Sequence, residues 1–195
     1  MELLDHEDGQ TPLDPDEMGG LIPSHLQTRG QLNEWEGMNI EKALTWAHSS
    51  RRKGKMMEMD PLFTLHKKMF SQTWDWAGEA RKTGKSIGVA PHKIFNSLIH
   101  LLKYVEGWVE WKAYSMGEMA YRYHHKLVKI HVFPNGNGRH ARLATDMLLR
   151  ENNEEPFTWG RDIKASSENV RAMYLNTLRT ADGGEYSKLS AFVRS

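Results

Sequence analysis

The chain has 195 residues, of which 39% are hydrophobic, and this length suits one domain with short additions rather than two full domains. Lys and Arg number 26 against 25 Asp and Glu, so the chain lacks the basic excess that drives sequence-independent nucleic-acid binding, and we expect no nucleic-acid partner. The absence of cysteine excludes a disulfide framework, thiolate zinc sites and thiol catalysis.

The N-terminal segment predicts a cytoplasmic protein with an extended arm. Residues 1–10, MELLDHEDGQ, lack the positive region and apolar core of a secretory signal. No stretch approaches the roughly 18 apolar residues of a membrane span, so we expect no membrane partner. Pro12, Pro15 and the Gly19-Gly20 pair predict that residues 1–29 are extended, which leaves residues 30–195 for the domain.

Apolar residues recur at steps of three to four along most of the remaining chain, which is typical of amphipathic helices. Ser115 and Glu118 have the spacing of a capping box, and Asp60-Pro61 resembles a helix start. The fold class is therefore predicted to be all-α. The predicted helices cover residues 31–48, 61–72 and 92–108, one opened by Ser115 and carrying Ile130, one beginning near Asn137, and one around 170–178.

One segment breaks the helical pattern. Residues 81–91, RKTGKSIGVAP, are punctuated by glycine, with Ser86, Ile87, Gly88 and Val89 between basic residues. This composition predicts a small exposed β-hairpin.

The run HVFPNGNGRHAR, residues 131–142, lies between two predicted helices. Gly136 and Gly138 allow backbone conformations that turn successive N–H groups around an anion, and the N-terminus of the next helix lies behind them. Arg139 and Arg142 share a face of that helix, where guanidinium groups suit phosphate oxygens. The pattern predicts a phosphate-binding loop.

His131 ends the helix before this loop, where a neutral imidazole could take a proton from a hydroxyl as general base. A lone histidine at a helix end is more often structural, so this assignment depends on its neighbours. A second interpretation groups His124, His125, His131 and His140 with Asn137 as a metal nuclease site. Against it, the motif has no carboxylate and the histidines fall on different faces of two helices.

The run resembles the motif of the Fic/Doc (Fido) family, His-Pro-Phe-x-acid-Gly-Asn-Gly-Arg-x-x-Arg. The positions that match are His131, Phe133, Gly136, Asn137, Gly138, Arg139 and Arg142. Residues 74–81, WDWAGEAR, look like the Fic segment before the target-docking flap, and 82–90 would be that flap. TPLDPDEMGGLIP and LNEWEG are similar to the subgroup called mobile mystery protein B, typically encoded beside a helix-turn-helix partner.

The resemblance implies a Fic-type helical bundle with a β-hairpin flap that binds ATP with magnesium and transfers AMP to a Ser, Thr or Tyr hydroxyl of a target protein. It makes His131 the base and assigns phosphate binding to the backbone at Gly136 and Gly138, the Asn137 side chain and both arginines. The flap would align the target as an added strand. Glycine at 138, where the Doc branch has lysine, favours AMP transfer. The target itself is not named by any motif.

Two positions depart from the family pattern. Val132 replaces proline, and Asn135 replaces the acidic residue that holds magnesium in most Fic enzymes. Magnesium prefers charged oxygens, so an amide should bind it more weakly, and manganese is an alternative. A nucleotide-binding or protein-interaction module without efficient transfer is therefore an alternative to the enzyme.

The N-terminal helix carries a candidate regulatory residue. Residues 32–37, LNEWEG, resemble the Glu-Gly end of the inhibitory helix found in many Fic proteins, with Leu32 where Ser or Thr is usual. That resemblance predicts that Glu36 pairs with Arg142 and obstructs ATP. The alternative is that Glu36 is a solvated residue of an amphipathic helix.

Overall fold

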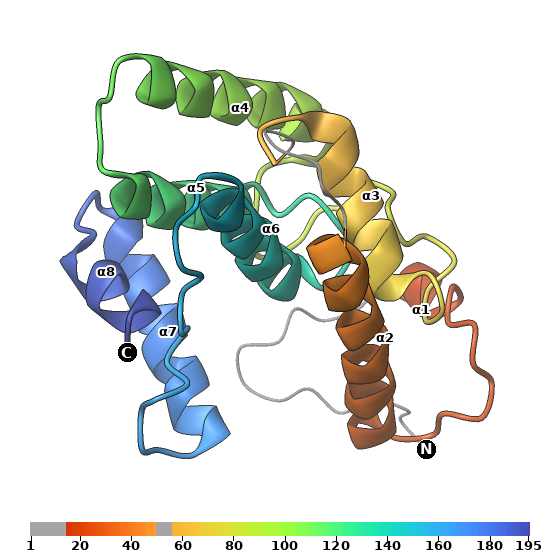
Figure 1. Cartoon of the computed structure of the whole chain (residues 1–195). Helices are drawn as coiled ribbons and strands as arrows, with labels where there is room; N and C mark the ends of the chain where they lie inside the picture. Colours follow the sequence, from red (N-terminus) through yellow and green to blue (C-terminus); the bar gives the residue numbers. More distant parts are fainter. Residues whose placement is uncertain (1–14, 50–55) are drawn as a thin grey trace.

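The computed structural model describes residues 15–49 and 56–195, and within them it is a helical bundle without β-strands (Figure 1). The helices are α1 (Pro15–Met18), α2 (Arg29–Ser49), α3 (Met59–Phe70), the 3₁₀ turn η1 (Pro91–Lys93), α4 (Ile94–Glu110), α5 (Met116–Ile130), α6 (Asn137–Glu151), α7 (Ser167–Asp182) and α8 (Ser187–Val193). The all-α prediction is confirmed. No helix in this part of the chain is both long and apolar enough to cross a membrane.

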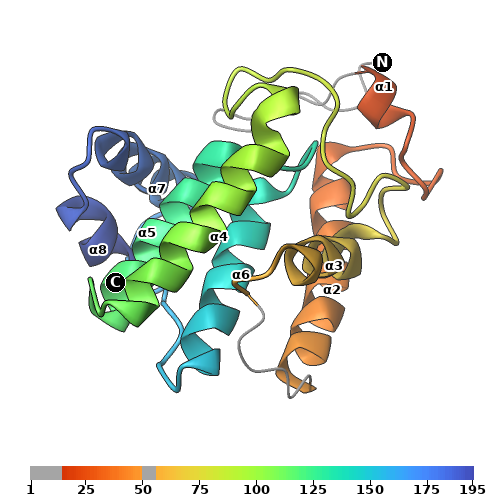
Figure 2. The same ribbon diagram turned by 90° about the horizontal axis from the view of Figure 1, so that it is seen from above.

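Helices α5 and α6 form the centre of the bundle, and the 131–136 loop joins them. Helix α4 packs on α5, and α3 packs on α6 and carries α2 on its other side (Figures 1 and 2). Helices α7 and α8 pack together at the opposite end, where α8 contacts α5. The loop between α5 and α6 therefore has α2 and α3 on one side and α7 on the other.

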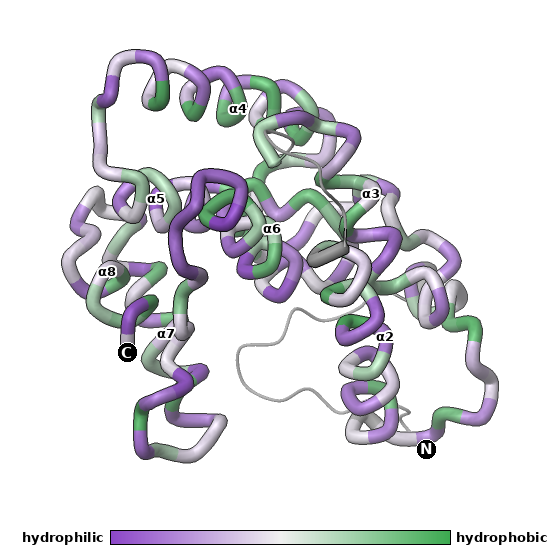
Figure 3. The backbone as a smooth tube through the Cα atoms, in the orientation of Figure 1, coloured by the Kyte–Doolittle hydropathy of each residue, from purple (hydrophilic) through white to green (hydrophobic). Residues whose placement is uncertain are grey.

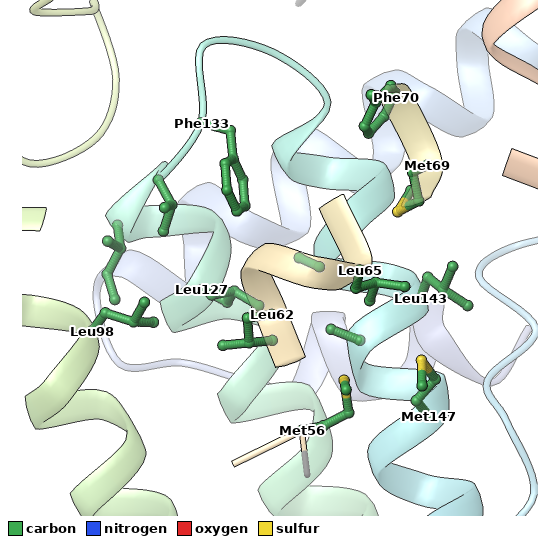
Figure 4. Packing of buried hydrophobic residues seen from close by; sticks show 14 of the residues in the cluster. Met56, Leu62, Leu65, Met69, Phe70, Leu98, Leu127, Phe133, Leu143 and Met147 are labelled. Carbon is green, nitrogen blue, oxygen red and sulfur yellow. The ribbon is translucent and has the colours of Figure 1, made fainter. Parts of the chain in front are cut away.

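Two clusters of buried side chains hold this arrangement. The larger one joins α3 to α4, α5 and α6, and Figure 4 shows Leu62 and Leu65 of α3 among Leu98, Leu127 and Leu143. The smaller one ties α7 and α8 to α5 and α6. Hydrophobic and hydrophilic stretches alternate along α4 in Figure 3, as expected for a helix with one buried face.

The predicted helices all exist, with ends that differ by a few residues from the predicted ones. The Ser115 hydroxyl accepts a hydrogen bond from the Glu118 N–H (3.2 Å), so the predicted cap is present. Helix α8 was not predicted. The described part of the predicted arm contains the short helix α1, and after it Leu21 forms an antiparallel bridge with Trp74.

The predicted hairpin is wrong, because residues 82–90 form an irregular loop that we call the flap. The buried Arg81 side chain supplies the hydrogen bonds that a second strand would have supplied. Its guanidinium donates to the main-chain oxygens of Thr83 (2.9 Å), Val89 and His131 (2.6 Å). Gly88 has a φ of 97°, which turns the flap back toward α5. Hydrogen bonds from the Arg81 side chain to both ends of the flap thus take the place of the main-chain hydrogen bonds of a hairpin.

Candidate active site

The 131–136 loop has a tightly determined backbone. His131 ends α5 in the left-handed conformation (φ 56°), and Gly136 precedes α6 with φ 76°. A Cβ at Gly136 would lie 2.5 Å from the Phe70 ring, so both conformation and space require glycine there. The loop therefore presents the first turn of α6, whose N–H groups lack intrahelical partners, at the surface of the core.

Asn137 fixes this loop from inside. Its Oδ1 accepts from the Phe133 N–H (2.9 Å) and its Nδ2 donates to the Phe133 carbonyl (2.7 Å). Phe133 itself is buried, which anchors the loop to the core. Both polar atoms of the Asn137 side chain bond the loop backbone, which gives this side chain a structural role. Its Nδ2 has a second N–H, so the phosphate-donor role stays a prediction.

His66 of α3, which sequence reasoning did not single out, packs against the loop and bonds its backbone. Its Nδ1 accepts from the Gly78 N–H (3.0 Å), so its Nε2 is the atom that carries a proton and donates to the Asn135 carbonyl (3.1 Å). Its ring stacks on Phe133 with centroids 3.7 Å apart. Burial, and then the nearby His140, hold the pKa of His66 well below its usual value, which preserves this neutral form.

A cleft of about 710 Å³ opens beside the loop, within the range of small-molecule sites. On one side it is lined by His131, by residues 135–138 and by both motif arginines. On the other side it is lined by the 159–165 segment and α7, including Trp159 and Tyr174. The structure thus brings His131, Asn135, Gly136, Asn137, Gly138, Arg139 and Arg142 to one cavity, together with Ile87 of the flap.

Glu36 is fully buried and holds the first motif arginine. Its Oε2 lies 2.8 Å from Nη1 of Arg139, and its Oε1 accepts from the Trp74 indole N–H (2.7 Å). The predicted pair with Arg142 is therefore wrong, and so is the interpretation of Glu36 as a solvated residue. Helix α2 faces the start of α6, which places Arg139 within its reach.

Arg142 has no carboxylate bound to it among the described residues and lies instead between aromatic rings. Its guanidinium carbon is 4.2 Å from the centroid of Tyr174 and 5.8 Å from that of Trp159. Its Nε is buried and has no hydrogen-bond partner in this part of the chain. The rings orient the guanidinium without neutralising its charge.

His131 is 4% exposed, and its pKa is lowered to about 4, first by burial and then by the charges of Arg81 and Lys85. The imidazole is therefore neutral at neutral pH, as a general base requires. The flap approaches it closely, since a Cβ at Gly88 would lie 2.6 Å from the His131 Cβ. Lys85 pairs with the buried Glu17 of α1, so the arm holds the flap in place.

Asn135, the predicted metal position, is hydrogen-bonded through both of its oxygens. Its Oδ1 accepts from the Gly136 N–H (2.6 Å), and its main-chain oxygen accepts from His66. Its Nδ2 is buried and without a partner among the described residues. The side chain offers a donor rather than a free oxygen.

The four histidines of the nuclease interpretation do not converge. His124 bonds the Tyr174 hydroxyl (2.9 Å), His125 bonds the Tyr186 hydroxyl (2.9 Å), and His140 bonds the Leu62 carbonyl (2.9 Å). Across residues 15–49 and 56–195 no group of three or more His, Cys, Asp or Glu side chains is arranged to hold a metal ion. His124, His125 and His140 thus each have a structural partner of their own, and of the four only His131 lines the cleft.

Residues 57–149 match the model of the Fic/DOC family. The fold is similar to that of BepC from Bartonella tribocorum with bound AMPPNP, at 17% identity and a TM-score of 0.70 over 93% of this chain and 97% of that chain. It is also similar to the N-terminal Fic domain of a Bep effector from Bartonella quintana with bound ADP. The identity is 16% and the TM-score is 0.69, over 88% of this chain and 86% of that chain. Fic-1 (aa134–508) from C. elegans is 23% identical, with a TM-score of 0.66 over 91% of this chain and 51% of that one. No curated protein matches the chain.

Proposed function

We propose that this chain, whose residues 57–149 match the model of the Fic/DOC family, is a protein adenylyltransferase that transfers AMP from ATP to a Ser, Thr or Tyr hydroxyl of a target protein. The observation that carries the proposal is one cleft that joins a neutral, buried histidine, a helix N-terminus and two arginines. Structures of the same fold hold AMPPNP and ADP, which supports a nucleotide as the ligand of this cleft.

In the proposed step, the hydroxyl oxygen of the target attacks the α-phosphorus of ATP. The hydroxyl proton passes to His131, and the bond from the α-phosphorus to the bridging oxygen breaks, so pyrophosphate leaves with the electron pair. The pKa of His131, about 4 in the free protein, makes it a weak acceptor. Bound phosphates would raise that pKa, because negative charge nearby favours the imidazolium.

The chain's own groups would hold the charge of the triphosphate. The N–H groups in the first turn of α6 offer anion contacts, and Arg139 and Arg142 supply fixed positive charge for the departing pyrophosphate. Asn137 and His66 hold the backbone of the loop, so little rearrangement of it is needed at the moment of transfer.

Magnesium, which the family resemblance implies, does not fit the donor set at Asn135. Both oxygens of this residue already accept hydrogen bonds, and the atom without a partner is an amide nitrogen, which cannot ligate a cation. The cleft lining among the described residues includes no Asp or Glu. No step of the proposed reaction therefore runs through a metal ion.

Regulation by α2 is part of the proposal. Glu36 neutralises Arg139 in the free protein, so a phosphate that needs this guanidinium must displace a buried carboxylate. This contact would lower ATP affinity or misplace its phosphates. Glu36 would thus inhibit by holding Arg139 rather than Arg142.

The flap would dock the target. Ser86, Ile87 and Gly88 are exposed, Ile87 also lines the cleft, and Val89 anchors the end of the flap by donating its N–H to the Ile130 carbonyl (3.3 Å). A target segment lying along Ser86–Gly88 would bring its hydroxyl next to His131.

The test incubates the protein with α-labelled ATP and a cell lysate, in MgCl₂, in MnCl₂ and in EDTA. Transfer of label to protein supports the proposal, and His131→Ala should abolish it while ATP affinity changes less than about twofold. His100→Ala, an exposed histidine on α4, is the matched control and should label as wild type. Equal labelling by His131→Ala would contradict the enzyme assignment. Binding of ATP without any labelling would support the nucleotide-binding module instead.

A further inference from the structure

Among the residues described, the charged side chains that line the cleft are all positive. Arg139, Arg142, Arg161 and Arg171 contribute to its lining, and no carboxylate does. We propose that this cleft binds a nucleoside polyphosphate as the free anion, without a divalent cation, and that arginines and N–H donors take the place of the metal. This inference rests on nucleotide binding at the proposed site, but it does not require that AMP is transferred.

The orientation of the Asn135 amide is determined by its neighbour. The Gly136 N–H is a donor and lies 2.6 Å from one side-chain atom of Asn135, so that atom is the oxygen. The amide NH₂ is then the group left without a partner among the described residues. A donor at this position attracts phosphate oxygens and repels a cation, which reverses the usual preference of the position.

No other group at the loop restores a cation site. Glu36 is the acidic residue paired with a motif arginine. Its Oε1 accepts from Trp74, and its Oε2 lies in an ion pair with Arg139. A magnesium ion usually needs one or two carboxylates beside the phosphates. Positive charge is already present in the arginines, and the buried Nε of Arg142 is a further donor without a partner in the described chain. A metal–nucleotide complex would bring additional positive charge to this side.

The experiment measures ATP binding by calorimetry in the His131→Ala background, which prevents turnover, once in excess EDTA and once in excess MgCl₂. We expect affinity in EDTA that equals or exceeds affinity in magnesium. In the same background, Asn135→Asp should weaken binding in EDTA by about tenfold, because it places a charge beside the phosphates, and magnesium should restore it.

Asn33→Asp is the matched control, since Asn33 also lines the cleft but lies exposed on α2. The same chemical change there should create no response to magnesium. If the His131→Ala protein with Asn135 unchanged binds ATP in magnesium but not in EDTA, the inference is overturned while AMP transfer remains possible. Metal-free binding in this experiment, together with no labelling by the wild-type protein in the α-labelled ATP test, would support the inference and remove the proposed reaction. No binding in either condition would remove both.

Discussion

On each side of the cleft a tryptophan donates a hydrogen bond to a carboxylate, but the contacts of the motif arginine differ between the two sides. On the α2 side, Trp74 donates to Glu36, and the same carboxylate reaches Arg139. On the α7 side, Trp159 donates to Asp146 (3.0 Å), while Arg142 lies over aromatic rings. A carboxylate competes with an incoming anion, whereas rings orient a guanidinium and leave its charge available. Only the α2 side should therefore inhibit nucleotide binding.

The largest effect is expected from Glu36→Gly. Removal of the carboxylate frees Arg139 and should raise ATP affinity and protein labelling by about tenfold, within the usual range of coupling between sites. Glu34→Gly, an exposed position of the same helix, should change neither. Calorimetry with ATP and labelling with α-labelled ATP give the two readouts.

Glu36→Gln separates charge from packing, because it keeps an acceptor for Trp74 while removing the negative charge. It should behave like Glu36→Gly in binding and remain closer to wild type in its melting temperature. If both variants fold and neither changes ATP affinity, α2 is a packing element only.

Arg142→Lys probes the α7 side. Lysine keeps the charge but loses the planar fork held against Tyr174, so ATP affinity should fall by about five- to tenfold. Arg150→Lys, exposed near the end of α6, is the control. In an Arg142→Lys, Glu36→Gly double variant, the two changes in the free energy of ATP binding should add. An increase in affinity on Arg142→Lys alone would show that Arg142 is restrained as Arg139 is.

Asp146→Asn should stabilise the fold at neutral pH. Burial raises the pKa of Asp146 to about 6, above its unfolded value of 3.8, so its contribution is most favourable below about pH 3.8 and is lost as the pH rises through 6. The amide retains an acceptor for Trp159 and avoids the buried charge. We expect a gain of about 1–2 kcal/mol in unfolding free energy at pH 7.5 that vanishes below pH 4.

Denaturant unfolding at several pH values measures this gain. Asp162→Asn, at an exposed aspartate, should show no such pH dependence. Destabilisation by Asp146→Asn at pH 7.5 would mean that the ionised carboxylate supports the α7 side more than its burial costs.

The smallest effect belongs to Trp159→Phe, which removes the indole N–H and keeps most of the ring. Loss of this bond should cost about 1 kcal/mol of unfolding free energy at pH 7.5. Trp111→Phe, at a largely exposed tryptophan, should cost almost nothing. If Trp159→Phe lowers the unfolding free energy as little as the control does, groups other than the Trp159 indole N–H hold Asp146 in place.

The helices and the glycine requirement of the loop could be predicted because they depend on local properties. Periodic apolar residues identified α2 to α7, and the need for φ > 0 at Gly136 follows from the turn itself. His131 at the end of α5 and the basic face of α6 followed from spacing along one segment.

The rest depends on contacts between segments that are distant in sequence. Arg139 and Arg142 share one helix face, so spacing could not decide which of them α2 would reach. The flap looked like a hairpin because its glycines suit a turn, but the Arg81 side chain satisfies its carbonyls instead. His66 gave no signal beyond its place on a buried helix face. The target, the helix-turn-helix partner and the subgroup stay predictions.

The close approach of Gly136 to the Asn135 side chain also bears on the chemical lifetime of the protein. Asparagine is a thermolabile residue, and a following glycine has no Cβ to keep its nitrogen away from the side-chain amide. Attack by that nitrogen releases ammonia, and hydrolysis of the ring then leaves an acidic residue at position 135, whereas Asn137 is restrained by Phe133. We expect stored samples to deamidate at Asn135 before Asn137, which peptide mass mapping would detect. An aged preparation would then respond to magnesium although a fresh one does not.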